Sequence, residues 1–210
     1  MKTSALIIFA KTPVLGKVKT RLQPDISQAE GLKIYKSFVK EIAGRCAKLK
    51  GLDRLLGCAP TIDDDFLKGL AARHKFEMFN QRGADLGARI LNAFKDHLKK
   101  GYKKVIIIGT DSPTIPPEFI KKAFTALDRN DFILGPCCDG GYYLVGAKKT
   151  FPKVFKNIPW DTREVLVKTI EKLYASRIKF SLLPFWYDVD TAKDLRFLKK
   201  HRKYLGKRQS

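Results

Sequence analysis

The sequence has few of the residues that build thiolate or histidine sites. Its 210 residues include four cysteines and three histidines. The cysteines have no CxxC or zinc-type spacing, and Cys137 and Cys138 are adjacent. The sequence therefore offers few ligands for a structural zinc site and few histidines for a Ser-His-Asp triad. Unpaired, buried thiols are typical of a reducing compartment.

Long apolar runs are also lacking. The runs at positions 5–10 and 105–108 fall far short of the ~20 residues that a membrane-spanning helix needs. The run that follows Met1 and Lys2 is too brief for a signal peptide and has no small-residue cleavage site. We therefore expect a cytoplasmic protein without a membrane span.

Acidic residues are scarce relative to basic ones. Forty-two Lys and Arg against 21 Asp and Glu give a net charge of +21, which attracts anions of any class. The bases recur along predicted helices and are densest from Lys193 to Arg208, as on a solvated helix surface. No nucleic-acid-binding motif accompanies them, so we expect no specific nucleic acid partner.

The hydrophobic content of 44% and the length predict a globular chain with one domain over residues 1–210. Strands are predicted at 5–10, 54–59, 75–80, 105–108, 131–135, 142–147 and 179–183, and helices at 27–49, 63–73, 84–99, 116–127, 165–174 and 192–204. Asp161 to Glu164 resembles a capping box, with Asp161 as the N-cap of the helix that follows. The alternation of strands and helices predicts an α/β fold, a three-layer α/β/α sandwich. Continuous apolar strands indicate a mainly parallel sheet, and two successive strands near 131–147 make it mixed.

The loop after the first strand, KTPVLGKVKTR at positions 11–21, is a candidate phosphate site. Ligands of open α/β sheets bind at the carboxyl ends of the strands, where this loop begins. Its basic side chains, including Lys11, Lys17 and Arg21, suit a di- or triphosphate through charge-assisted hydrogen bonds. Gly16 lets the backbone approach a ligand closely. The Walker A pattern is missing, and an ordinary basic surface loop is the alternative.

Two acidic segments are candidates for a divalent metal. Asp111, in GTDSP, follows the most hydrophobic predicted strand, where a carboxylate beside a polyphosphate would bind Mg²⁺ or Mn²⁺. In YDVDT, Asp188 and Asp190 alternate along an extended segment and face the same side. Asp111 and Asp190 are the predicted metal ligands. The alternatives are a turn that caps a helix at Asp111 and a helix N-cap at Asp190.

The segment DGGYY at positions 139–143 is a candidate site for a bound group that carries hydroxyls or a ring. Gly140 and Gly141 permit a positive φ and leave space for a bound group. Asp139 suits hydrogen bonds to hydroxyls or the work of a base, and Tyr142 suits stacking on a ring. An ordinary hairpin turn is the alternative.

Taken in order, these segments resemble one family over residues 5 to about 198. The segments are FAKTPVLGKVKTRL, GADLGARI, IGTDSP, GPCCDGGYYLVGA, IPWDT and DVDTAKDL. They are similar to the bacterial glycosyltransferase-like family DUF2064, within the GT-A (nucleotide-diphospho-sugar transferase) superfamily. Its members are often described as transferases associated with radical-SAM or arsenosugar gene clusters.

The resemblance implies a Rossmann-like GT-A fold with a nucleotide beside the first strand. It implies a divalent cation on the diphosphate at Asp111, and phosphate contacts at Lys11, Lys17 and Arg21. Residues 139–143 match the place of the sugar or the acceptor. The chain departs from better-characterised relatives in having no full DxD motif, and in carrying Cys138 where a polar or acidic residue is expected.

The function so implied is transfer of a glycosyl group from a nucleotide sugar to an acceptor. Mg²⁺ or Mn²⁺ at Asp111 and Asp190 would neutralise the diphosphate, and Asp139 would orient or deprotonate the acceptor hydroxyl. The loop KxxxxGKxKTR and the segment DVDTxxDL also look like nucleotidylyltransferases such as the molybdenum-cofactor and phospholactate guanylyl enzymes, which use an NTP and release pyrophosphate. A third alternative is a non-catalytic nucleotide or nucleic-acid binder, which predicts a steep salt dependence and no turnover.

Overall fold

A computed structural model describes residues 3–207, so Met1, Lys2 and Arg208 of the sequence analysis lie outside the described residues. The strands are β1 (Ser4–Lys11), β2 (Asp53–Ala59), β3 (Glu77–Asn80), β4 (Lys104–Ile108), β5 (Phe132–Pro136), β6 (Tyr142–Ala147) and β7 (Phe180–Leu182). The helices are α1 (Gln28–Ala47), α2 (Asp65–His74), α3 (Leu86–Lys99), α4 (Pro117–Arg129), α5 (Pro152–Phe155), α6 (Val165–Ala175) and α7 (Ala192–Lys207), with a 3-10 turn at Thr20–Leu22.

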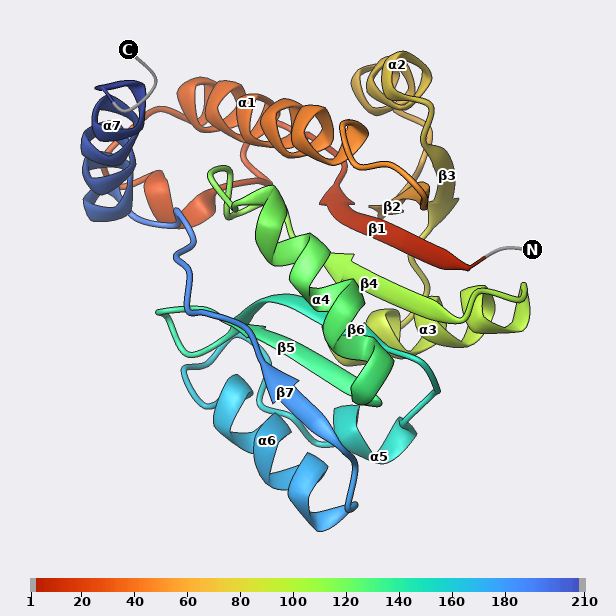
Figure 1. Ribbon diagram of the computed structural model, residues 1–210. Coiled ribbons are helices and arrows are strands. Elements are labelled where there is room, and N and C mark those ends of the chain that lie inside the picture. Colours follow the sequence, from red (N-terminus) through yellow and green to blue (C-terminus); the bar gives the residue numbers. More distant parts are fainter. Residues whose placement is uncertain (1–2, 208–210) are drawn as a thin grey trace.

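The strands form one seven-stranded sheet in the order β3-β2-β1-β4-β6-β5-β7 (Figure 1). β1 to β4 pair in parallel, β6 is antiparallel to both β4 and β5, and β7 is parallel to β5. This confirms the prediction of a mixed, mainly parallel sheet. Because β6 alone runs the opposite way, the other strands all end at the same edge of the sheet.

Helices cover both faces of the sheet, which confirms the predicted three-layer α/β/α sandwich (Figure 1). Side chains of α1, α2 and α4 pack on one face, and those of α3, α5 and α6 pack on the other. β1 contributes alternate residues to each face: Leu6 and Ile8 to the first, Ala5 and Ile7 to the second. Each buried Leu or Ile contributes roughly 1.5–3 kcal/mol, so the continuous apolar run of β1 stabilises both layers.

The predicted capping box at positions 161–164 is wrong. The first residue of α6 is Val165 and its N-cap is Glu164, while Asp161 has a φ of 66° and lies outside the helix. The backbone N–H of Glu164 donates instead to the Thr162 hydroxyl, at 3.2 Å. An N-cap must directly precede the helix, and Asp161 is too far upstream to reach the N–H groups of the first turn.

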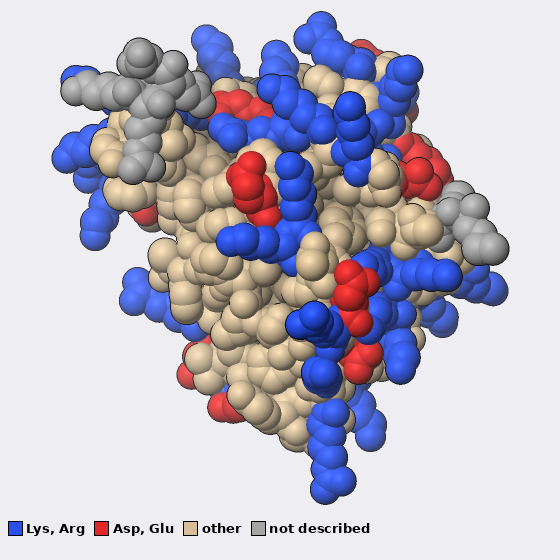
Figure 2. All heavy atoms as spheres, in the orientation of Figure 1, with Lys and Arg blue, Asp and Glu red and all other residues tan. Residues whose placement is uncertain are grey.

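In Figure 2 basic side chains gather most densely along the top and right of the face shown, with acidic side chains in small groups between them. On α7, Lys193, Arg196, Lys199, Lys200, Arg202 and Lys203 are exposed. Within residues 3–207, no helix has the length and apolar character to cross a bilayer.

Candidate functional site

The four segments that the sequence puts forward meet at the carboxyl edge of the sheet. They follow β1, β4, β5 and β7, which all end there. Backbone hydrogen bonds hold the last segment between two others: Cys138 N donates to Trp186 O at 2.9 Å, and Val189 N donates to Asp111 O at 2.9 Å. The chain between β7 and α7 therefore brings its own acidic residues against those of the earlier loops.

Lys19 is the buried basic residue of this edge. Its side chain is 3% exposed, and its ammonium donates to Val189 O at 2.7 Å and to Asp190 Oδ1 at 3.0 Å. It also forms an ion pair with Asp111 Oδ1 and lies 5.3 Å from the centre of the Phe38 ring. Burial lowers the pKa of Lys19, but the carboxylates of Asp111 and Asp190 outweigh burial, and the net pKa is raised above its ordinary value. Lys19 therefore carries its charge in the folded protein.

The other basic residues of the loop are exposed. Arg21 lies with its Nη1 3.6 Å from Asp190 Oδ2, and its side chain is 59% exposed. Lys11 and Lys17 are exposed at the same loop, with no hydrogen bond or ion pair to their ammonium groups among the described residues. Gly16 has a φ of 74°, which an L-residue adopts only with strain. The loop thus has one buried basic side chain, that of Lys19, and three exposed basic side chains that a ligand can reach.

Asp190 belongs to the site and not to the cap of α7. Thr191 directly precedes the helix, and its hydroxyl accepts from Asp194 N at 3.4 Å. Asp194 Oδ2 in turn accepts from Thr191 N at 2.8 Å, which completes a reciprocal cap. The alternative that Asp190 caps the helix is therefore wrong, and its carboxylate is 29% exposed beside Lys19.

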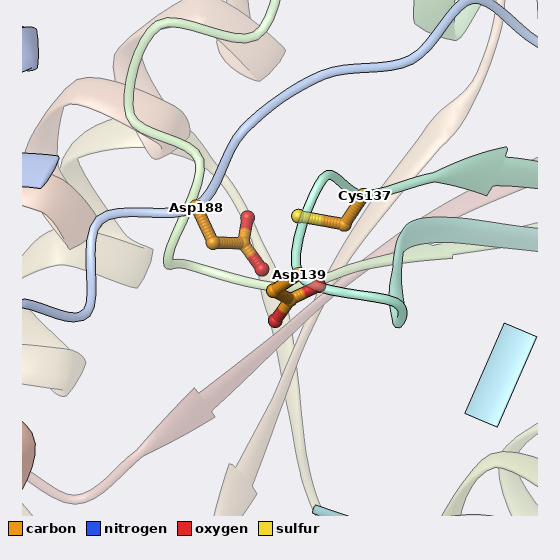
Figure 3. A group of neighbouring side chains, drawn as sticks. All are labelled: Cys137, Asp139 and Asp188. Carbon is orange, nitrogen blue, oxygen red and sulfur yellow. The ribbon is translucent and has the colours of Figure 1, made fainter. Parts of the chain in front are cut away.

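A second group of possible metal ligands lies beside Lys19, Asp111 and Asp190. Cys137 Sγ and carboxylate oxygens of Asp139 and Asp188 lie within 4.8 Å of one another (Figure 3). Asp188 also accepts a hydrogen bond from the Ser112 hydroxyl. Burial, then the charge of Asp111, raise the pKa of Asp188 to about 7; the bond from Ser112 opposes this, and two more carboxylates add to it.

The carboxylates outnumber the cations that neutralise them. Four carboxylates interact here, those of Asp111, Asp139, Asp188 and Asp190. Lys19 and Arg21 are the basic groups paired with them, and both pair with Asp190. The site therefore has an excess of negative charge around Asp188.

The donor set fits a hard divalent cation. Mg²⁺ and Mn²⁺ prefer oxygen ligands, which the carboxylates supply. Burial raises the pKa of the Cys137 thiol far above its ordinary value, so its sulfur stays protonated and is a poor ligand for such an ion. The excess of negative charge around Asp188 also favours a cation at this place.

The turn between β5 and β6 presents Asp139 to solvent. Asp139 is exposed, and its Oδ1 accepts from Gly141 N at 2.9 Å. Gly140 has a φ of 93°, and a Cβ there would lie 2.2 Å from Arg163 O. Gly140 O also accepts from Leu166 N at 2.9 Å. Gly140 therefore fits the turn tightly against the start of α6, and Asp139 points from this turn toward Asp188 (Figure 3).

Tyr142 lies away from these carboxylates. Its ring packs edge-on against Trp160, with the ring centres 6.3 Å apart, and belongs to the core between the sheet and α6. Burial raises the pKa of its hydroxyl, which is enclosed. The structure thus brings together Asp111, Asp139, Asp190 and the loop cations, but does not bring Tyr142 to them.

Sequence reasoning missed the part that Lys19 takes. It counts among the basic residues of the loop, but nothing in the motif distinguishes it from Lys17. The only available signal is its place between the buried Val18 and Leu22, which is a common pattern at surfaces as well. Its burial depends on carboxylates that lie far away in the sequence.

Comparisons with known proteins show the family and the fold of this chain. Residues 42–162 match the family described as "uncharacterized protein conserved in bacteria (DUF2064)". A solved structure from Desulfovibrio desulfuricans G20, a candidate nucleotide-diphospho-sugar transferase, is 36% identical, with a TM-score of 0.86 over 94% of this chain and 87% of that one. No curated protein matches the sequence.

Two distant structures show likeness of fold alone. CMP:2-keto-3-deoxy-manno-octonic acid synthetase, complexed with CTP, is 11% identical, with a TM-score of 0.59 over 99% of this chain and 100% of that one. Glucosyl-3-phosphoglycerate synthase from Mycobacterium tuberculosis, in complex with Mn²⁺, UDP and glucosyl-3-phosphoglycerate, is 9% identical, with a TM-score of 0.55 over 89% of this chain and 71% of that one. The fold is therefore of the GT-A and nucleotidyltransferase type.

Proposed function

This chain belongs to the bacterial DUF2064 family, and from that premise we propose that it is a nucleotide-dependent transferase with its active site at the carboxyl edge of the sheet. The transferred group is a glycosyl unit, donated by a nucleotide-diphospho-sugar, and residues 1–210 act as one catalytic domain. The observation that carries the proposal is the meeting of an exposed basic loop with an acidic cluster at this edge. The assignment of the 36% identical relative supports it.

The basic loop binds the diphosphate. Lys11, Lys17 and Arg21 are exposed on it and supply charge-assisted hydrogen bonds to phosphate oxygens. Gly16, with its positive φ, keeps the backbone free of a side chain where the loop turns. These groups hold the donor in place and stabilise the negative charge of the leaving nucleoside diphosphate.

A divalent cation belongs between the loop and the acidic cluster. Asp111 and Asp188 are the residues that would hold Mg²⁺ or Mn²⁺, since Asp190 pairs with two cations, Lys19 and Arg21, whereas Asp111 pairs with Lys19 alone among the described residues. The ion would supply charge neutralisation at the diphosphate. Ser112, which donates to Asp188, fixes the direction of that carboxylate.

Asp139 serves the acceptor. It is exposed beside Asp188, and the N–H of Gly141 fixes one of its oxygens. An acceptor hydroxyl oxygen forms the new bond to the anomeric carbon, the bond from that carbon to the diphosphate oxygen breaks, and the hydroxyl proton passes to the Asp139 carboxylate. The nucleoside diphosphate leaves with the electron pair of the broken bond.

Nucleotidyl transfer is a second candidate. Three exposed cations on one loop suit the higher charge of a nucleoside triphosphate. In that reaction a substrate oxygen attacks the α-phosphorus, and pyrophosphate leaves. The same edge would bind the triphosphate, so only ligand preference and product identity separate the two reactions.

A thermal-shift panel of nucleotides, with and without Mg²⁺ or Mn²⁺ at fixed salt, tests the proposal. A specific ligand at ~100 times its Kd adds roughly 2.7 kcal/mol of stability. We expect metal-dependent stabilisation by one nucleotide sugar beyond that given by its nucleoside diphosphate. Preference for one NTP would support nucleotidyl transfer instead. Equal effects of all polyanions that salt abolishes would contradict both enzymatic proposals and favour a non-catalytic binder.

A further inference from the structure

The surroundings of the Lys19 ammonium resemble part of a metal coordination shell. Its neighbours are a carboxylate oxygen of Asp111, a carboxylate oxygen of Asp190 at 3.0 Å and the carbonyl oxygen of Val189 at 2.7 Å. An ammonium has three N–H donors, so this set of acceptors satisfies all of them. The ammonium lies between the two carboxylates that the sequence puts forward as metal ligands.

The position is enclosed as well as charged. The Lys19 side chain is 3% exposed, and the ring of Phe38 lies 5.3 Å from its nitrogen on the side of the core. The backbone bond from Val189 N to Asp111 O fixes the spacing of the two acidic segments. A cation bound to the Oδ1 atoms of Asp111 and Asp190 would have to take the place of the ammonium.

We propose that Lys19 is a built-in counter-ion that competes with a divalent cation for the Asp111 carboxylate. It keeps Asp111 and Asp190 assembled without metal, and its positive charge weakens the binding of a free divalent cation beside them. This rests on the proposed function only in that the same carboxylates serve the nucleotide site. Lys19 acts here as a positioning residue.

The test is Mn²⁺ binding without nucleotide, followed by electron paramagnetic resonance of the free ion. Lys19→Met removes the charge, and we expect it to bind Mn²⁺ about tenfold more tightly than wild type, or more. Lys33→Met makes the same change at an exposed position of α1, and its Mn²⁺ affinity should match wild type. Equal or weaker Mn²⁺ binding by Lys19→Met would overturn the proposal.

A stability readout separates competition from a merely structural role. Lys19→Met leaves Asp111 without its cation and Asp190 with Arg21 alone among the described bases, so its Tm should fall, and saturating Mn²⁺ should raise its Tm more than that of wild type. A Tm that falls and that Mn²⁺ does not restore would show that Lys19 only stabilises the fold.

A second variant covers the case in which Lys19→Met does not fold. Lys19→Gln keeps an N–H donor for Val189 O or a carboxylate without the charge, and should show the same gain in Mn²⁺ affinity. Adding Asp111→Asn to Lys19→Gln should abolish that gain in Mn²⁺ affinity. A gain that persists would mean that Lys19 does not compete with the divalent cation for the Asp111 carboxylate. Because these titrations contain no nucleotide, they decide the role of Lys19 even if the nucleotide panel contradicts the proposed function.

Discussion

The acidic cluster at the carboxyl edge and the basic surface of α7 lie two residues apart in the sequence, at Asp190 and Ala192. In the cluster, the buried Lys19 ammonium pairs with Asp111 and Asp190. Burial, followed by the charge of Asp111, raises the pKa of Asp188 to about 7. On α7 the basic side chains are exposed, and among those described Arg202 forms an ion pair, with Glu41 at 2.5 Å. Solvent screens the charges on α7, whereas the charges in the cluster interact at short range. The strength of a charge interaction in this protein therefore depends more on where the charge lies than on the net charge of +21.

Loss of an acidic group from the cluster should have the largest effect. Asp111→Ala should lower turnover by on the order of 10²–10³-fold or more, because it removes a carboxylate that holds charge at the diphosphate. Lys19 keeps Asp190 and Val189 O as partners, so the Tm should change little. Steady-state kinetics and a melting curve measure the two effects.

The control for that variant is Asp128→Asn, which changes an acidic residue of α4 that pairs with Lys104 of β4. Its turnover should equal that of wild type. Retained turnover in Asp111→Ala would mean that Asp111 has no part in the mechanism. The loss of a carboxylate from the cluster would then affect turnover no more than the loss of an exposed one.

The turn that presents Asp139 can be broken through Gly140. Gly140→Ala should lower both stability and turnover, because its new Cβ meets Arg163 O at 2.2 Å. Overpacking of this kind costs roughly 1–3 kcal/mol beyond the strain of a positive φ. Chemical denaturation and steady-state kinetics measure the effects.

Gly101→Ala is the matched control for Gly140→Ala. Gly101 has a similar φ of 95° but nothing within 4 Å of a new Cβ. It should therefore lose only the roughly 1–2 kcal/mol of a left-handed residue and keep its turnover. Equal losses in the two variants would show that the contact with Arg163 has no part in holding the turn.

A smaller effect is expected at the border of the two regions. Arg21→Ala should weaken nucleotide binding by about 10- to 100-fold, since a charge-assisted hydrogen bond contributes about 1.5–3 kcal/mol. Calorimetric titration measures it, with Arg73→Ala on the exposed face of α2 as the control. An unchanged affinity in Arg21→Ala would argue against the basic loop as the phosphate site.

The smallest effect on catalysis is expected on α7. The triple variant Lys199→Gln, Lys200→Gln and Lys203→Gln should keep turnover within about twofold, because these side chains are exposed and their field is screened. Its binding to non-specific polyanions should weaken, with the salt slope reduced by about 0.9 for each lysine that contacts a phosphate. A large loss of turnover would mean that the basic surface takes part in the reaction.

Sequence reasoning predicted the sheet, and it placed the candidate acidic and basic residues at one edge of that sheet, because both depend on local pattern. The apolar run at 105–108 follows the rule for a buried strand, and Asp111 follows it at the edge where ligands bind. The same reasoning failed at Asp161, because a capping pattern needs the right distance from the helix as well as the right residues. The prediction of Tyr142 at the ligand did not take account of the pleat of β6, which directs its ring toward Trp160 in the layer of α3, α5 and α6.

The amino-acid sequence by itself determined the layers of the fold, the direction of most strands and the edge at which acidic and basic residues gather. These follow from burial and periodicity, which act over a few residues at a time. Only the tertiary structure decided that Lys19 and not Lys17 lies between Asp111 and Asp190. The physical reason is that a buried ammonium needs several oxygen partners at once, and here those partners come from segments that only the folded sheet brings together.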